Sequence, residues 1–270
     1  MRLKTNQKRH YGATAAYLDQ LLQAGRVAFS LSQLMEQTGI SESAAKNQLR
    51  RLGARIVRVA PKQAFFLIVE PEHSVAGCPP ADLWLDDYFA WLGHPYYLAL
   101  QTAAGIYGSS PQAIQVTQVM TDTPRRALAI GRRKIVFFVK RRIRSTLTQP
   151  VSSVPAPLKA SSPASTVFDL IRYAGQVGGI GRAVETARPL LAKMTVRDLR
   201  ATLDAEDENA TSQRLGFITE KTGHEKLAAT IDRWLPPKRP LTPLACNTSA
   251  TTGSLAPRWQ VNDNTKEFDP

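Results

Sequence analysis

The sequence predicts an α+β protein: an N-terminal winged helix-turn-helix, then a larger mixed domain with a small β-sheet and a C-terminal helical bundle. Three observations support this prediction. Residues 11–69 have the pattern of three short amphipathic helices followed by two strands rich in β-branched and aromatic residues. Residues 113–141 contain two further strands, and residues 164–235 repeat apolar side chains at the helical period. A chain of this length fits one large domain or two of ordinary size.

A proline-rich joint separates the two predicted domains. Residues 71–80 contain three prolines and a glycine, which are the residues that most often interrupt regular structure. We therefore expect the winged helix-turn-helix at 1–75, the second domain at 81–262 and a tail at 263–270.

The stretch 31–52 has the pattern of a helix, a tight turn and a second helix. Leu31 and Leu34 share one face of the first helix. Gly39 stands where the chain reversal needs a residue that tolerates positive φ. Ser41 is placed to cap the second helix by accepting from its free amides.

The second of these helices has an apolar face and a polar face. Its inward stripe consists of Ala44, Ala45, Leu49 and Leu52. The opposite face is rich in hydrogen-bond donors and suits the major groove of DNA, where Asn reads adenine and Arg or Lys reads guanine. An ordinary helical hairpin with a solvated face would show the same pattern.

Two strands follow and complete the winged arrangement. Residues 55–59 and 64–69 are β-branched and aromatic, with a turn at Pro61 between them. The tip of such a hairpin, the wing, lies along the phosphate backbone or in the minor groove. The residues that we expect to bind DNA, from the second helix through the wing, are Ser43, Lys46, Asn47, Arg50, Arg51, Arg55 and Lys62.

The positive charge is concentrated in two regions. The net charge is +13; residues 1–80 hold 11 basic and 5 acidic side chains, and residues 113–144 hold 9 basic and 1 acidic. The remaining residues are close to neutral. This distribution points to a polyanionic partner.

The second basic region is predicted to be a hairpin between strands at 113–120 and 134–139. Three interpretations stay open: an extension of the DNA footprint, a contact with RNA or an acidic protein, or a solvated charged surface. This second basic patch consists of Arg125, Arg126, Arg132, Arg133, Lys140, Arg141 and Arg142.

Four further expectations concern the second domain. Residues 96–108 read as one buried helix ending at a glycine, and residues 151–163, rich in Pro, Ser and Ala, read as a flexible linker. Ser165 is expected to cap the next helix. In the proline-rich C-terminal segment, only residues 257–262 have an ordered pattern.

Composition excludes several classes of protein. Cys78 and Cys246 lie far apart in no metal-binding spacing, which excludes a disulfide framework or a cysteine zinc site. No apolar run reaches the ~20 residues that a membrane span needs, and the N-terminus lacks the apolar core of a signal peptide. We therefore expect a soluble, cytoplasmic protein.

Enzymatic chemistry is not supported by the sequence. Asp82, Asp86 and Asp87 lie near His94 and suggest a metal-dependent nuclease, but no second carboxylate motif completes a two-metal site. The glycine-rich stretch 175–181 lacks the Lys-Ser/Thr of a phosphate-binding loop. We predict no enzyme, no cofactor and no metal.

Several short segments, in a fixed order, carry a resemblance to a known family. They lie at 96–100 (YYLAL), 115–126 (QVTQVMTDTPRR), 137–141 (FFVKR), 164–171 (ASTVFDLI), 212–217 (SQRLGF), 240–243 (PLTP) and 257–259 (PRW). Together they resemble the AbiEi family of type IV antitoxins. Residues 151–163 and those after Leu244 depart from the pattern.

The resemblance implies a two-part protein without catalytic residues. The winged helix would repress its own operon by binding inverted repeats in operator DNA, with the family's DNA-reading helix at Ser43, Lys46, Asn47 and Arg50. The larger domain would counter a nucleotidyltransferase toxin encoded beside it, without a stable complex. The alternatives from the residues alone are a winged-helix transcription factor with a ligand-sensing C-terminal domain, or the nuclease.

Overall fold

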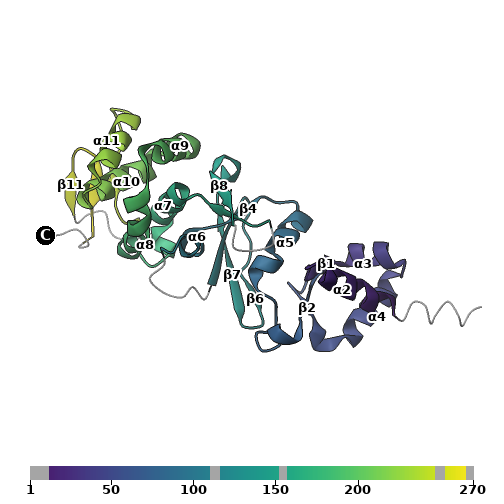
Figure 1. Cartoon of the computed structure of the whole chain (residues 1–270). Helices are drawn as coiled ribbons and strands as arrows, with labels where there is room; N and C mark the ends of the chain where they lie inside the picture. The colour runs from purple at the N-terminus through teal and green to yellow at the C-terminus, as the bar shows by residue number, and fades with distance from the viewer. Residues whose placement is uncertain (1–11, 110–115, 152–156, 247–252, 266–270) are drawn as a thin grey trace, which may run out of the picture.

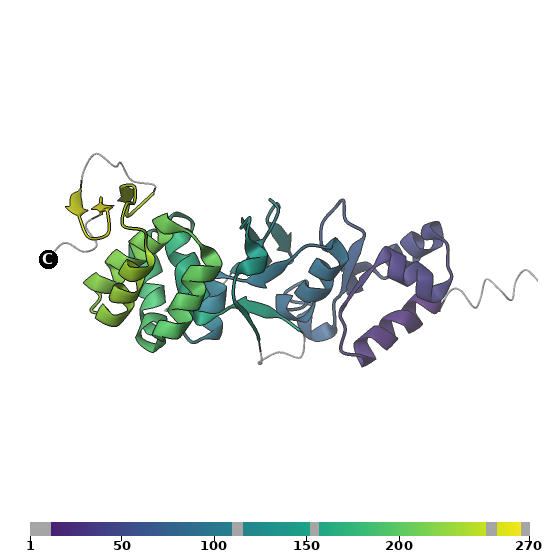
Figure 2. The ribbon, with the colours of Figure 1, turned by 90° about the horizontal axis from the view of Figure 1, so that it is seen from above.

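The structure is a computed structural model and describes residues 12–109, 116–151, 157–246 and 253–265. Its parts follow one another along an elongated molecule (Figure 1). A small N-terminal unit lies at one end, a six-stranded sheet in the middle, and a helical bundle with a small third sheet at the other end. The same order is seen from above (Figure 2). The predicted α+β class is confirmed.

The N-terminal unit has helices and strands at the predicted positions. Its strands form a three-stranded antiparallel sheet in the order β1-β3-β2, in which β1 adds a third strand to the predicted hairpin. The elements are α2 (Ala13–Gln23), β1 (Ala28–Ser30), α3 (Leu31–Thr38), α4 (Glu42–Arg51), β2 (Ile56–Arg58) and β3 (Phe65–Ile68).

Local chemistry explains where α3 and α4 begin and end. The Ser30 side chain accepts from the backbone N–H of Gln33, and the Gln33 side chain accepts from the N–H of Ser30, which is a capping box. Gly39 ends α3 at φ 66°. Ser41 caps α4 by accepting from the N–H of Ala44.

Helix α5 (Leu85–Leu92) lies between the N-terminal sheet and the central sheet. On one side, the rings of Tyr88 and Phe65 of β3 have centroids 5.4 Å apart. On the other side, Phe89 stacks on Tyr96 at 4.5 Å and meets Phe137 edge-on at 6.1 Å. The two units therefore share one apolar cluster.

The predicted joint at 71–80 packs against the central sheet. The N–H of Arg132 donates to the carbonyl of Ala76 at 2.8 Å, and Cys78 Sγ donates to the carbonyl of Ile130 at 3.1 Å. A Cβ on Gly131, whose φ is +55°, would come within 2.0 Å of the Ala76 carbonyl oxygen. Only glycine fits this turn.

The central sheet is mixed, with the strand order β6-β7-β5-β4-β9-β8. β5 pairs parallel with β7, β4 pairs parallel with β9, and the other neighbours are antiparallel. Its strands are β4 (Tyr96–Leu98), β5 (Val116–Thr121), β6 (Leu128–Ile130), β7 (Arg133–Val139), β8 (Thr148–Pro150) and β9 (Lys159–Ser161).

The predicted hairpin between 113–120 and 134–139 is wrong. β5 and β7 run parallel, and β6 pairs antiparallel with β7, so the hairpin is the tight turn at Gly131. The alternating pattern identified β5 and β7 but carried no information on their direction. Residues 113–115 lie outside the described residues.

Three other expectations for the second domain need correction. The helix predicted at 96–108 begins as strand β4, because its aromatic side chains pair into the sheet; α6 covers only Leu100–Ile106. Within the predicted linker 151–163, β9 lies inside the sheet beside β4, while 152–156 lie outside the described residues. The next helix is capped by Ser162, whose Oγ accepts from the N–H of Ser165.

The bundle covers one end of the central sheet (Figure 1). The predicted segment 257–262 is ordered, but it is not the whole ordered part, because Thr242–Pro243 and Ser254–Ala256 also form strands. Trp259 is fully buried and leaves no room for a Cβ at Gly216, which would lie 2.1 Å from its ring. The elements here are α7 (Pro163–Arg172), α8 (Ile180–Lys193), α9 (Val196–Glu206), α10 (Asn209–Lys221), α11 (Glu225–Trp234), β10 (Thr242–Pro243), β11 (Ser254–Ala256) and β12 (Val261–Asp263).

Lys140 does not belong to a surface patch, contrary to the sequence prediction. Its side chain is 1% exposed, and its ammonium donates to Asp169 at 2.8 Å and to Glu206 at 2.7 Å. It also donates to the hydroxyl of Tyr97, which in turn donates to Asp169 at 2.7 Å. This Lys140 network ties β4 and the end of β7 to α7 and α9.

Replacing Lys140 by methionine should strongly destabilise the protein, because Asp169 and Glu206 would remain buried without a counter-charge. Breaking a buried ion pair in this way costs about 3–5 kcal/mol. The matched control is Arg142→Met, which removes the exposed pair with Asp207 and should cost at most about 1 kcal/mol. Urea unfolding measures both; similar losses would contradict a special role for the buried network.

The same network predicts a pH dependence. Burial raises the pKa of Glu206 above its ordinary 4.5, Lys140 opposes the rise and Asp169 adds to it. The folded state therefore holds this proton more tightly than the unfolded state. The resulting stabilisation is complete below pH 4.5 and is lost as the pH rises through the raised pKa.

Glu206→Gln should remove this pH dependence. Between pH 4.5 and pH 8, the free energy of unfolding of the native protein should fall relative to that of the variant. The exposed Glu185→Gln is the control and should follow the native protein. Parallel pH profiles for Glu206→Gln and the native protein would show that Glu206 does not carry the effect.

Candidate nucleic-acid interface

The polar face of α4 is exposed as the sequence predicts. Ala45 is fully buried and Leu49 is nearly so, which fixes the inward side of the helix. The opposite side presents Ser43, Lys46, Asn47 and Arg50 to solvent, and Arg51 is also exposed. The structure thus brings the predicted α4 residues together on one face.

One ion pair lies within this face. Lys46 Nζ is 2.5 Å from Glu42 Oε1, one helical turn earlier. The hydrogen bond from Lys46 lowers the pKa of Glu42, and its charge lowers it further. A phosphate that approached Lys46 would compete with this carboxylate.

The wing is braced from both sides. Arg58 donates to the carbonyl of Pro61 at 2.9 Å, and its guanidinium lies over the Phe66 ring at 5.1 Å. Gln63 accepts a hydrogen bond of 2.8 Å from the hydroxyl of Tyr88 in α5. Lys62 and Arg55 remain exposed. Lys62 lies on the turn that the second domain helps to hold, whereas Arg55 precedes β2 at the other end of the hairpin.

The second basic patch is not one surface. Arg132 and Arg133 lie at the start of β7, whereas Arg141 and Arg142 follow its end. The seven-residue strand β7, which begins at Arg133, is about 20 Å long and holds the two pairs apart. Of the other members, Lys140 is buried, Arg126 is exposed, and Arg125 is half-buried with its guanidinium 5.8 Å from the Phe89 ring centre.

The acidic residues near His94 are committed to separate partners. The Tyr96 hydroxyl donates to Asp86 at 2.8 Å, Asp87 pairs with Arg26 at 3.1 Å, and His94 pairs with Asp122 at 2.8 Å. Because each of these acidic side chains is paired with a different residue, these contacts do not favour the nuclease alternative.

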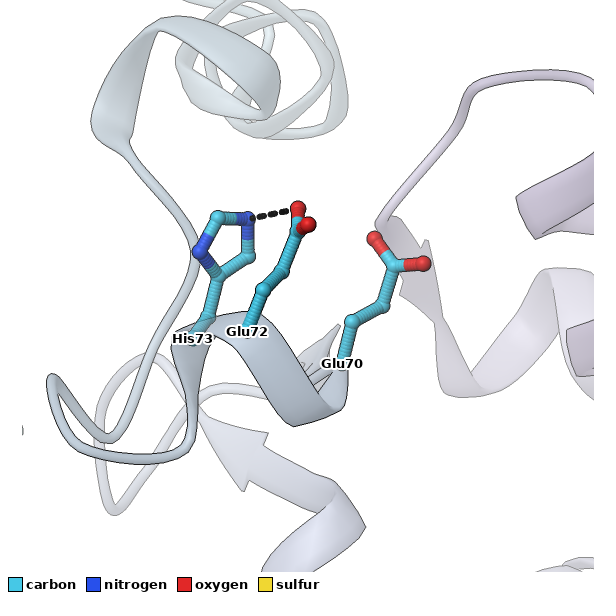
Figure 3. Close-up of side chains that lie close together, drawn as sticks. All are labelled: Glu70, Glu72 and His73. Carbon is cyan, nitrogen blue, oxygen red and sulfur yellow. Dashed lines mark ion pairs between the residues drawn. The ribbon is translucent and has the colours of Figure 1, made fainter.

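A group that the sequence analysis missed lies in the joint (Figure 3). Glu70, Glu72 and His73 offer three ligand atoms within 4.8 Å of one another. The exposed Glu72 lies 3.2 Å from His73 Nε2 and pairs with it, while the Glu70 carboxylate lies beside this pair without an ion pair to His73 (Figure 3). The order Glu-x-Glu-His was the available signal. Because Glu72 is 73% exposed and already paired, this group does not form a closed coordination shell.

None of the described helices has the length and the apolar run that crossing a membrane requires.

Comparison with solved structures supports the overall arrangement. The RV2827C protein from Mycobacterium tuberculosis aligns with a TM-score of 0.66 at 16% sequence identity, over 95% of this chain and 93% of that chain. At this identity the similarity shows a shared fold alone. A search of curated proteins gives no match.

The family comparison concerns the second domain. The family described as AbiEi antitoxin C-terminal domain matches residues 97–221. This range runs from β4 to the end of α10 and contains the whole Lys140 network. It also includes most of the segments that carry the sequence resemblance. Residues 97–221 are therefore similar to the AbiEi antitoxin C-terminal domain.

Proposed function

We propose that this protein is the antitoxin of a type IV toxin-antitoxin system. Its N-terminal unit, residues 1–75, is a winged helix-turn-helix that binds inverted repeats in operator DNA and represses the operon. Its second domain, residues 81–262, neutralises a nucleotidyltransferase toxin without a stable complex. The observation that carries the DNA-binding half is the exposed, donor-rich face of α4 in a chain with an AbiEi antitoxin C-terminal domain.

The arrangement of α4 supports its role as the recognition helix. Its apolar side is anchored by Ala45 and Leu49, so its opposite face is held rigidly. Asn47 and Arg50 are one turn apart on that face and have the donor geometry that reads adenine and guanine. Arg55 and Lys62 would add contacts to the phosphate backbone, which position a protein without reading sequence.

The turn between β6 and β7 supports a larger DNA footprint. Arg132 and Arg133 are exposed, and their turn is bonded to Ala76 in the joint next to the N-terminal unit. In Figure 1, this turn and α4 both lie toward the lower edge of the molecule. Arg141 and Arg142 lie at the far end of β7, and Arg142 is paired with Asp207.

In this proposal the protein acts in the cytoplasm, without enzymatic turnover or a cofactor. One specific observation favours the second candidate, a transcription factor that senses a ligand: a cavity of about 480 Å³ lies between the N-terminal unit and α5. The two candidate functions differ in whether the protein neutralises a toxin. Only the antitoxin restores growth to cells that express the neighbouring nucleotidyltransferase.

Replacing Lys46, Asn47 and Arg50 together by alanine should abolish operator binding. Each good base contact contributes about 1–3 kcal/mol of discrimination, so the loss should exceed about 100-fold in affinity. Electrophoretic mobility shift with the operator measures this loss, while rescue of toxin-expressing cells should persist.

The matched control replaces three exposed cations of the bundle, Lys193, Arg197 and Lys226, and should leave the mobility shift intact. Circular dichroism verifies that both triple variants are folded. If the α4 variant still retarded the operator with unchanged sequence preference, α4 would not be the recognition helix.

Replacing Arg132 and Arg133 by alanine should reduce the salt dependence of DNA binding. Each lost phosphate contact lowers the slope of log affinity against log salt by about 0.9. Titrations at several salt concentrations should therefore give a slope smaller by about 1.8. The Arg141→Ala/Arg142→Ala variant should keep the native slope. If only the Arg141/Arg142 variant had a smaller slope, the DNA would contact the far end of β7 instead. If neither variant changed the slope, the second domain would not contact DNA.

A further inference from the structure

A cavity lies where the N-terminal unit meets the second domain. Its volume is about 480 Å³, large enough for a small organic molecule. One wall comes from the end of α2 and the segment leading to β1, and the other comes from residues just before and within α5. Any molecule bound here would touch both units.

The apolar part of the cavity is formed mainly by three large side chains from the two units, with Ala24 and Pro157 beside them. Leu22 and Val27 belong to the N-terminal unit, and Leu83 precedes α5. A hydrated metal ion would gain nothing from these walls. An organic molecule with an apolar body would displace water from them.

The charged part of the cavity is predominantly acidic. Glu70, Asp86 and Asp87 all line it, and among the described lining residues Arg26 is the one cation. Arg26 is engaged by Asp87 at 3.1 Å, while Asp86 receives only the neutral hydroxyl of Tyr96.

The Glu70 side chain has no hydrogen bond or ion pair among the described residues. Its carboxylate lies within 4.8 Å of the ligand atoms of Glu72 and His73 but forms no ion pair with His73 (Figure 3). The C-terminal end of α2 also lies at this cavity, at Ala24, and adds the negative end of a helix dipole. The cavity therefore has a negative potential next to apolar walls.

We propose that this cavity binds a small organic cation with an apolar body. Its apolar part would contact Leu22, Val27 and Leu83, and its positive charge would lie among Glu70, Asp86 and Asp87. The cation would compete with Arg26 for Asp87, because both would occupy the same negative region. The cavity therefore selects its ligand both by the apolar body and by the positive charge.

Two probe ions of the same shape and opposite charge test this proposal. Tetraphenylphosphonium and tetraphenylborate would each be titrated calorimetrically into the full-length protein, in sodium buffer with EDTA to remove metals from Glu70 and His73. The cation should bind at one site, and the anion should bind at least about tenfold more weakly. Equal binding of both ions would overturn the charge assignment, and binding of neither would overturn the site.

Variants of the lining residues should shift the affinity in both directions. Glu70→Gln and Asp86→Asn should each weaken binding of the cation about fivefold to tenfold, whereas Arg26→Gln should strengthen it by a similar factor. The nearby acids Glu72 and Asp82 do not line the cavity, so Glu72→Gln and Asp82→Asn should leave binding unchanged. A gain from Arg26→Gln cannot arise from misfolding. Weaker binding in that variant, or equal losses in the control variants, would contradict the proposal.

A regulatory consequence follows, and it rests on the proposed DNA binding. If the bound cation changes how the units are held together, it changes operator affinity, and the operator changes the affinity for the cation by the same factor. Mobility shifts with and without tetraphenylphosphonium should therefore differ in the native protein but not in a Glu70→Gln/Asp86→Asn variant. An unchanged shift in the native protein would refute regulation while leaving the calorimetric result, which needs no DNA, intact.

Discussion

The whole molecule depends on one short helix whose two sides are both buried. Tyr88 and Phe89 of α5 are buried on two neighbouring sides of the helix, while Ala90 and Trp91 remain exposed. Tyr88 faces the N-terminal sheet, while Phe89 faces the central sheet. The elements on either side therefore cannot be positioned independently. The wing, the joint and the cavity all take their geometry from this helix.

The second domain has its own organising centre in the Lys140 network. One ammonium satisfies two buried carboxylates that come from α7 and α9. Such a network adds little net stability compared with an apolar core, but it becomes costly when one member is missing. It therefore favours one arrangement of the bundle on the sheet, and it lies entirely within the part of the chain that matches the AbiEi family.

Local patterns predicted the N-terminal elements well, because each depends on neighbouring residues. The capping by Ser30 and Ser41 and the positive φ of Gly39 are set within a few positions along the chain. The second domain was predicted less well, because strand direction depends on distant partners. From the sequence alone, Lys140 could not be distinguished from its basic neighbours Arg141 and Arg142. Only the approach of Asp169 and Glu206, 29 and 66 positions away, distinguishes a buried cation from two exposed ones.

The close approach of Gly131 to the backbone of Ala76 has a consequence for how such proteins diversify. A turn of the second domain that admits only glycine is fitted to a segment that leads out of the first unit. The two units must therefore be inherited as a fitted pair. A chimera that joined the N-terminal unit of one protein to the second domain of another would need to transfer the joint, α5 and the β6–β7 turn together. Recombination at the proline-rich joint alone would leave mismatched surfaces on both sides, so exchange of whole domains is constrained by this contact.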